Sequence, residues 1–327
     1  MALPSFIAMG NDGFTTRCAR VLHDRARLIG LISQPAADRP DNSADTAAFA
    51  QAHDLDYLEV GDIHEPSVVK FLTDRRADYI FCAWPTLIRR DVFELAGRFC
   101  IGTHPTSLPR NRGRHPLHWM IVLGIEHAHV SFFILDDGID NGPLLHQQPF
   151  FVPHGQNINQ ANDSMELAAE KGTGHLVDKL IADTAFVGVA QDASHATYWR
   201  RRTRHDVTLD PRLSVDAICR IVRSYCPPYP AAKLMVEGTV LNIVAARPVA
   251  ADTFRPTTDL EHGSILDVAT GSVTMKADDG LVELVHTGSW PHHPATGMPV
   301  RRVHPPAYYL DRMLSGATPG KQVLGDA

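Results

Sequence analysis

This chain of 327 residues has little of what marks disulfide-bonded, membrane-spanning or secreted proteins. Its five cysteines are scattered, and no two of them have Cys-x-x-Cys spacing, which argues against a disulfide framework and against a zinc site. No apolar run reaches the ~18 residues that a membrane span requires, and the first ten residues lack the basic flank and apolar stretch of a secretory signal. We therefore expect a cytoplasmic protein with reduced cysteines and no membrane partner.

Basic residues are not in excess either, since 31 lysines and arginines stand against 37 acidic residues, for a formal net charge of −6. The attraction that drives nonspecific nucleic-acid binding is therefore missing for the chain as a whole, and we expect no nucleic-acid partner. With 44% hydrophobic and 21% charged residues the chain has the composition of a folded globular protein, and its length favours two domains. The sequence leaves the oligomeric state open and is compatible with a homo-oligomer.

In the first half of the chain, apolar runs alternate with segments of helical spacing. The runs that predict strands are 5–9, 28–33, 79–83, 99–103, 130–135 and 144–152, and the helices are expected at 14–26, 43–53, 66–73, 89–96 and 159–182. This alternation predicts an α/β fold with a mostly parallel, Rossmann-like sheet that binds ligands at the carboxyl ends of its strands. The first turn, Gly10-Asn11-Asp12-Gly13, is not G-x-G-x-x-G, so a dinucleotide site is not favoured.

The pattern changes after residue 185. Residues 186–212 are polar and basic, and their run Tyr198–Arg202 is either a solvated surface or a contact for an anionic substrate group. A helix expected at 214–225 ends at a proline cluster, and short alternating runs then predict a small barrel. The predicted organisation is a first domain at 1–185, a linker at 186–212, a smaller β-rich domain at 213–310 and a tail at 311–327.

Residues 101–142 concentrate the polar groups that suit chemistry. An apolar run ends at His104, and a later one delivers Asp140 together with Asp136 and Asp137. A histidine at one strand end and a carboxylate just past another suit proton transfer at a carbonyl, provided that the fold brings the two ends together. No histidine or further carboxylate follows the aspartate pair at ligand spacing, and the other histidines of this stretch form no closing set, so we expect no metal.

This stretch resembles the core of the 10-formyltetrahydrofolate-dependent formyltransferases, the family of methionyl-tRNA formyltransferase, glycinamide ribonucleotide transformylase and the sugar N-formyltransferases. In that family a strand ends in Asn-x-His, and a Ser-Leu-Leu-Pro turn, an Arg-Gly pair and a Leu-Asp-x-Gly follow. The matching positions are His104, Ser107, Leu108, Pro109, Arg112, Gly113 and Asp140. One catalytic position departs from the pattern, because Gly102 stands where the family has asparagine.

A second resemblance covers residues 221–247. In methionyl-tRNA and aminoarabinose formyltransferases an Arg-x-x-x-x-Pro-Tyr-Pro-Gly-Ala segment precedes a small OB-like barrel. Five positions match that segment, with Ala231 in the place of the glycine: Arg223, Pro228, Tyr229, Pro230 and Ala232. The two resemblances together imply a formyltransferase domain followed by a smaller, OB-like β-rich domain.

The resemblance implies transfer of a formyl group from 10-formyltetrahydrofolate to an amine. His104 would donate a hydrogen bond to the oxyanion of the tetrahedral intermediate, and Asp140 would orient the imidazole or a water and help accept the amine proton. The residues expected at the pterin pocket are Trp84, Ser107, Leu108, Pro109, Asp136 and Asp137. Those expected to bind the acceptor are Gly10, Asn11, Arg110, Arg112 and Arg114, the arginines because guanidinium groups match phosphates and carboxylates.

The acceptor is expected to be a small-molecule amine, with a nucleotide-linked amino sugar as the first choice. An amino-acid-derived or hydroxylated amine, as in a siderophore precursor, is the second. In methionyl-tRNA formyltransferases the loop that corresponds to residues 34–45 is basic and helps to grip the tRNA, whereas here it carries Asp38, Asp41 and Asp45 against Arg39 alone. This acidic loop counts against a methionyl-tRNA formyltransferase.

Two further hypotheses stay open: a 10-formyltetrahydrofolate hydrolase, which would need no amine pocket, and a non-catalytic folate-binding protein, which Gly102 keeps open. An oxyanion donor such as the missing amide is worth ~10²–10³ in rate. Thr103, Asn111 and Asn141 are the candidates to replace it. Glycine at a strand end can instead mark close approach of the backbone or a ligand.

Overall fold

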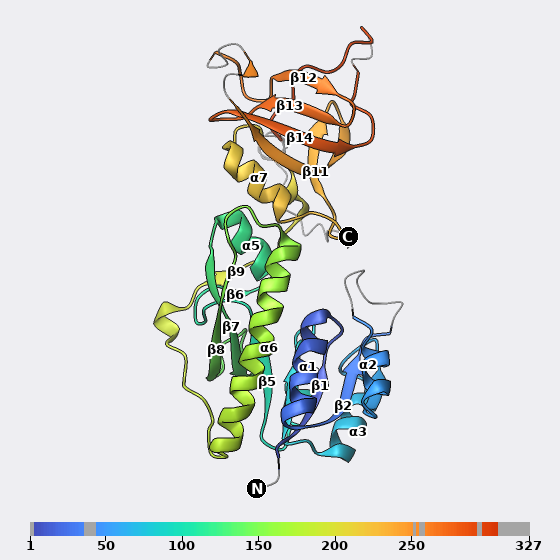
Figure 1. Ribbon diagram of the computed structural model, residues 1–327, viewed down its shortest axis with the longest axis vertical. Helices are drawn as coiled ribbons and strands as arrows, with labels where there is room; N and C mark the ends of the chain where they lie inside the picture. Colours follow the sequence, from blue (N-terminus) through green and yellow to red (C-terminus); the bar gives the residue numbers. More distant parts are fainter. Residues whose placement is uncertain (1–2, 36–43, 251–252, 255–258, 293–295, 307–327) are drawn as a thin grey trace, which may run out of the picture. The chain divides into compact units, whose positions relative to one another are not determined.

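The computed structural model describes residues 3–35, 44–250, 253–254, 259–292 and 296–306. The chain divides into two compact units, Met1–Arg201 and Arg202–Ala327 (Figure 1). Most of the acidic loop at 34–45 and all of the predicted tail lie outside the described residues. The predicted boundaries at 185, 212 and 310 stay predictions.

Unit 1 is built on a seven-stranded sheet with the strand order β3-β2-β1-β4-β5-β7-β8. The strands are β1 (Ser5–Met9), β2 (Arg27–Ser33), β3 (Asp56–Glu59), β4 (Tyr79–Cys82), β5 (Phe99–His104), β7 (His127–Ile134) and β8 (Leu144–Phe151). The strands from β3 to β5 pair in parallel, while β7 pairs antiparallel with both β5 and β8. The predicted mostly parallel α/β sheet is confirmed.

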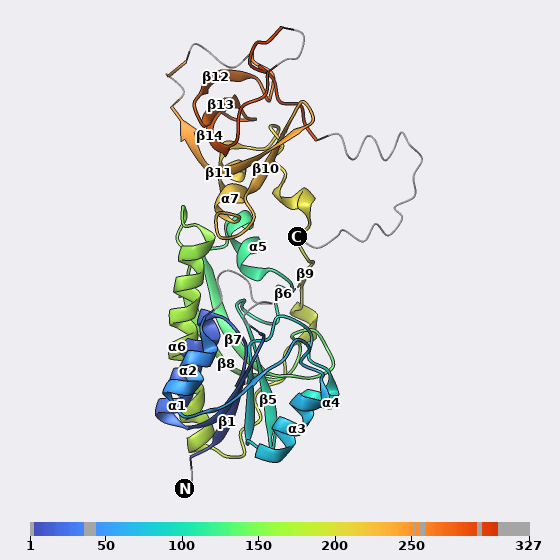
Figure 2. The same cartoon turned by 90° about the vertical axis from the view of Figure 1, so that its right-hand side faces the viewer.

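Helices cover both faces of this sheet. Figure 2 shows α1 (Gly13–Arg25) and α6 (Ile158–Ala182) on one face, and α3 (Pro66–Arg75) and α4 (Arg90–Phe93) on the other. The shorter α2 (Thr46–Ala52) and α5 (Pro116–Leu123) complete the unit. Apolar side chains of α3 and α4 form one buried core with those of β1 and β4, which fixes the strand ends where the polar residues begin.

Two short strands attach the segment after α6 to this unit. β6 (Arg112–Gly113) pairs in parallel with β9 (Tyr198–Trp199), although some 85 residues separate them in the chain. An isolated bridge between Leu144 and Val189 holds the same segment to unit 1 at a point before β9. The amino-terminal part of the predicted linker is therefore bonded to unit 1, next to the loop that follows His104.

Unit 2 begins with η3 (Arg204–Val207) and α7 (Val215–Arg223), which the Ser214 side chain caps by accepting from the Ala217 N–H. Its antiparallel sheet has the order β10-β11-β14-β13-β12. The strands are β10 (Ala232–Val236), β11 (Thr239–Val249), β12 (Ile265–Ala269), β13 (Ser272–Lys276) and β14 (Leu281–Thr287). The predicted smaller β-rich domain is confirmed, and no helix within the described ranges is long and apolar enough to cross a membrane.

Candidate active site

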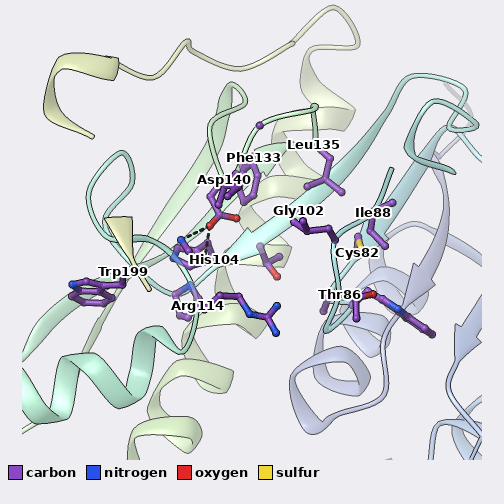
Figure 3. A pocket seen from close by; sticks show the side chains of 18 of the residues that line it. Cys82, Thr86, Ile88, Gly102, His104, Arg114, Phe133, Leu135, Asp140 and Trp199 are labelled. Atoms are coloured by element: carbon purple, nitrogen blue, oxygen red, sulfur yellow. Dashed lines mark hydrogen bonds and ion pairs between the residues drawn. The ribbon is translucent and has the colours of Figure 1, made fainter. Parts of the chain in front are cut away.

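A cavity of about 860 Å³ opens in unit 1 where β1, β4 and β5 reach their carboxyl ends. Figure 3 shows side chains from β4, β5 and the loops that follow β6 and β7 around it. Its walls are largely apolar. The lining residues are Asp12, Phe14, Cys82–Trp84, Thr86–Ile88, Gly102–Pro105, Gly113, Arg114, Phe133, Leu135, Asp136, Gly138–Asp140, Met165 and Tyr198–Arg201.

His104, the last residue of β5, lies on the cavity wall with its side chain almost fully buried. Its Nε2 is 2.9 Å from the carbonyl oxygen of Asn111, and because a carbonyl only accepts, Nε2 carries a proton. Its Nδ1 lies 3.5 Å from Oδ2 of Asp140, the contact drawn in Figure 3. Because Nε2 already carries a proton, Nδ1 is an acceptor in the neutral ring and a donor only in the imidazolium, and the Asp140 carboxylate faces it.

Asp140 is held in place through its backbone. Its φ of 51° lies in the left-handed region, and Nε2 of Gln191 donates to the carbonyl oxygens of both Asp140 and Gly142, at 2.9 and 2.8 Å. Oε1 of Gln191 in turn accepts from the buried Arg112. The Asp140 carboxylate also accepts from the Gly113 N–H at 2.8 Å. Sequence reasoning missed Gln191, which falls in the predicted linker without a local motif.

Six of the predicted site residues line the cavity: Trp84, Gly102, His104, Arg114, Asp136 and Asp140. The structure therefore brings the predicted His104 and Asp140 together with one of the three predicted arginines. The binding and catalytic roles of these residues stay predictions.

The other predicted residues do not line the cavity. The Asn11 amide donates to Gln34, and Gly10 precedes it in the same turn. Ser107 contacts Nδ1 of His129, Leu108 is buried with Pro109 beside it, and Asp137 pairs with Arg90. Arg112 binds Gln191 and the Tyr198 hydroxyl, and Arg110 is exposed.

Apolar side chains fill the space next to Gly102. A Cβ added there would lie 2.5 Å from Cδ2 of Leu135 and 2.8 Å from Cζ of Phe133. Figure 3 shows the Leu135 side chain next to Gly102. Glycine is therefore fitted to its surroundings, and no side chain at this position can reach the cavity unless Leu135 and Phe133 move.

Of the three candidate replacements for an amide at position 102, only Thr103 lines the cavity. The Asn111 side chain accepts from the Thr197 hydroxyl. The Asn141 amide lies against Gly138, where an added Cβ would come within 2.3 Å of it. Neither asparagine is directed at His104.

Asp12 is a cavity residue that the sequence reasoning did not single out. It caps α1, and its Oδ1 accepts from both the N–H and the hydroxyl of Thr15. Burial raises the pKa of the Asp12 carboxyl, and the Thr15 hydrogen bonds oppose that rise. The helix-cap position was the signal available in the sequence, since aspartate precedes a run of helical spacing.

Three arginines line the cavity: Arg114, Arg200 and Arg201. Arg114 follows β6 and Arg200 follows β9, so the pairing of these strands brings the two together. Arg200 stacks over the Trp119 ring at 5.1 Å, and the Trp119 indole donates to its carbonyl oxygen. Arg200 and Arg201 line the cavity and are exposed, so contact with an anionic ligand group and a solvated surface both stay predictions for this run.

No group of three or more histidine, cysteine, aspartate or glutamate side chains in the described part of the chain is placed to hold a metal ion.

Residues 10–175 match the sequence profile of the family described as Formyl transferase. A methionyl-tRNA formyltransferase from Roseiflexus sp. (strain RS-1) is 28% identical over 271 residues, which make up 80% of this chain and 80% of that protein.

Two solved structures share the fold at low identity. WlaRD, a sugar 3N-formyl transferase crystallised in the presence of dTDP and 5-N-formyl-THF, has a TM-score of 0.61 at 11% identity over 88% of this chain and 100% of that chain. HypX from Aquifex aeolicus in complex with tetrahydrofolic acid has a TM-score of 0.59 at 14% identity. It matches 97% of this chain but 48% of its own, so this chain spans about half the length of HypX.

Proposed function

Because this chain belongs to the formyl transferase family, whose enzymes use 10-formyltetrahydrofolate as the formyl donor, we propose that it transfers the formyl group to an amine of a small metabolite. A nucleotide-linked amino sugar is the first choice of acceptor. The observation that carries the proposal is the His104–Asp140 pair, which lies on the wall of a cavity that three arginines also line.

The cavity fits the donor in size and character. Its volume of about 860 Å³ lies within the usual range of small-molecule sites. Trp84, Ile88 and Leu135 supply flat and apolar walls for a pterin ring, with Asp136 beside them as a hydrogen-bond acceptor for ring N–H groups. When bound, the donor supplies a formyl group attached to a nitrogen that can leave as an amine.

His104 and Asp140 have complementary tasks in this proposal. With protons on both ring nitrogens, His104 donates Nδ1–H to the formyl oxygen as negative charge develops on it, and the Asp140 carboxylate stabilises this imidazolium. Asp140 Oδ2 also takes up the proton that the acceptor nitrogen loses as the new C–N bond forms, and returns it to the leaving nitrogen as the old C–N bond breaks. The enzyme therefore ends with the proton count it had at the start.

The arginines favour an acceptor that carries phosphate groups. Guanidinium groups bind phosphate oxygens bidentately, and Arg200 and Arg201 lie at the same cavity as His104. WlaRD, which shares the fold, was solved with dTDP. An amino-acid-derived or hydroxylated amine is the alternative small acceptor, and its carboxylate would use the same arginines.

The test is a transfer assay with 10-formyltetrahydrofolate and a panel of amines that includes dTDP-linked amino sugars, other nucleotide-linked amino sugars and amino acids with side-chain amines. The expected result is a formylated nucleotide sugar, identified by mass spectrometry, with stoichiometric tetrahydrofolate. Release of formate without a formylated amine would instead identify a hydrolase. Binding of folate with neither product would identify a binding protein.

Methionyl-tRNA formyltransferase is the second candidate function, because a protein of that name matches over 80% of both chains. Methionine-charged initiator tRNA belongs in the same assay. A kcat/KM for that tRNA above the value for every small amine would replace the first proposal with this one.

A further inference from the structure

We propose that Arg114 supplies the second hydrogen-bond donor to the formyl oxygen, in place of the side chain that position 102 lacks. The inference rests on the proposed function. Arg114 would then be a second catalytic residue beside His104, and its guanidinium would stabilise the charge of the oxyanion.

Position 102 itself supplies no side-chain donor. Leu135 and Phe133 occupy the space where a side chain at Gly102 would begin, at 2.5 and 2.8 Å from an added Cβ. A lone histidine would then face the developing charge, although one such donor is worth ~10²–10³ in rate. Successive side chains of a strand point to opposite faces of the sheet, so the Thr103 side chain is on the other face of β5 from His104, and a replacement has to come from another element.

Arg114 begins beside the catalytic pair. Its neighbour Gly113 donates its N–H to Oδ2 of Asp140 at 2.8 Å, and the same oxygen lies 3.5 Å from Nδ1 of His104. Consecutive Cα atoms are only ~3.8 Å apart, so the Arg114 side chain starts within one residue of this pair.

The tip of the Arg114 side chain is fixed at the end of β4. Its guanidinium donates to the carbonyl oxygen of Pro85 at 2.9 Å, and Pro85 lies three residues beyond the end of β4. β4 and β5 are neighbours in the sheet, with Cys82 opposite Gly102. The side chain therefore runs from the His104–Asp140 pair to the β4 end, and Figure 3 shows its guanidinium in the cavity on the side of His104.

The Arg114 guanidinium has N–H groups that are not used in hydrogen bonds within the described residues. It carries five N–H groups, and Pro85 takes one of its nitrogens while the structure gives the side chain no other partner in the described residues. The cation contributes no proton to the transfer. It donates hydrogen bonds to the oxygen while negative charge rests there, and releases it as the carbonyl re-forms, so the proton balance of the proposed transfer is unchanged.

The experiment compares Arg114→Gln and Arg114→Lys with Arg27→Gln, which changes an exposed arginine at the amino end of β2, the opposite end of the sheet from the cavity. Arg114→Gln is expected to lower kcat by ~10²–10³ and to leave both KM values within about threefold, with Arg114→Lys in between. If the glutamine variant fails to fold, the lysine variant carries the comparison. A rise in KM at unchanged kcat, or rates equal to those of Arg27→Gln, would overturn the proposal.

Two measurements do not depend on turnover with an amine. The carbonyl stretching band of bound, ¹³C-formyl-labelled 10-formyl-5,8-dideazafolate is expected at lower frequency in the wild type than in Arg114→Gln, with affinity by calorimetry nearly equal. Equal band positions would contradict the contact. Formate release by water places charge on the same oxygen, so if no amine is accepted, the same variants compared on that slow reaction still test Arg114 while the acceptor proposal alone fails.

Discussion

The packing of Phe133 and Leu135 around Gly102 decides how a side chain at that residue is tolerated. Gly102→Asn places a Cβ 2.5 Å from Leu135 and 2.8 Å from Phe133, so both must move. We expect a loss of about 1–3 kcal/mol in the free energy of unfolding, as for an overpacked core, and weaker donor binding. Urea unfolding and calorimetry measure the two effects.

The matched control for this change is Gly61→Asn, where the nearest atom to an added Cβ is a Glu65 carboxylate oxygen at 3.8 Å. That variant should keep the stability and donor affinity of the wild type. Unchanged binding and stability in Gly102→Asn, together with faster turnover, would contradict this expectation. The new amide would then act as an oxyanion donor, and Leu135 and Phe133 would move without loss of stability.

Asp140→Asn separates the charge of Asp140 from its place in the structure. The amide oxygen can still accept from Gly113, and the Gln191 bonds go to the backbone, so the loop should keep its shape. The amide cannot take up the amine proton or stabilise a proton on Nδ1 of His104. We expect kcat to fall by ~10²–10⁴ with little change in the melting temperature.

The control here is Asp74→Asn, an exposed aspartate on α3 that pairs with Lys70. Its kcat should equal that of the wild type. A loss of less than about tenfold in Asp140→Asn would show that the carboxylate only positions its neighbours.

At the scale of elements, helix α1 brings a carboxylate to the cavity. The Asp12 cap satisfies an N–H of the first helical turn, which an anionic ligand would otherwise compete for. Because burial raises the pKa of this carboxyl, the native state holds its proton more tightly than the unfolded chain does. Stability therefore falls as the pH rises from the ordinary carboxyl range through the raised pKa, and above it the ionised group destabilises the fold.

Asp12→Asn is therefore expected to raise the melting temperature at pH 7, because the amide keeps an oxygen for Thr15 without the charge. The gain should shrink as the pH falls below the ordinary carboxyl pKa. Asp45→Asn is the matched control, since Asp45 caps α2 in the same way from an exposed position. A gain of equal size in both variants, or a loss at pH 7 in Asp12→Asn, would contradict the role of burial.

Strand pairing over long sequence distances was the part of the site that the sequence could not predict. β6 and β9 have two residues each, too few for a periodic pattern, yet they bring Tyr198–Arg201 to the cavity. The half-polar edge strand β3 was likewise missed. The predicted His104 and Asp140 do lie together, because a strand end and a short loop fix their positions, whereas the surroundings of Gly102 depend on the packing of β7.

For the whole molecule, the apolar runs of both units were sufficient to predict the fold class. Buried strands such as Tyr79–Cys82 are continuous apolar segments, and the strands of unit 2 follow alternating runs between turns. The division into strands and helices is local information, which composition and spacing carry. The identity of the acceptor is not local information, because it depends on side chains from several loops at once.

The charge of the whole molecule leads to a prediction about salt. The chain carries a net charge of −6, and the arginines that serve the proposed function line a cavity. A tRNA-binding enzyme that contacts some 6–10 phosphates would lose ~10³–10⁵ in affinity between about 50 and 200 mM salt. A nucleotide sugar presents only two phosphates, so kcat/KM for that acceptor should fall by less than about tenfold over the same range.

Initial rates in a potassium chloride series measure this, with a charge-neutral amine as the control for effects on the enzyme itself. Efficient formylation of methionine-charged tRNA with a steep dependence on salt would instead require a basic surface elsewhere on the chain and would overturn the small-molecule proposal.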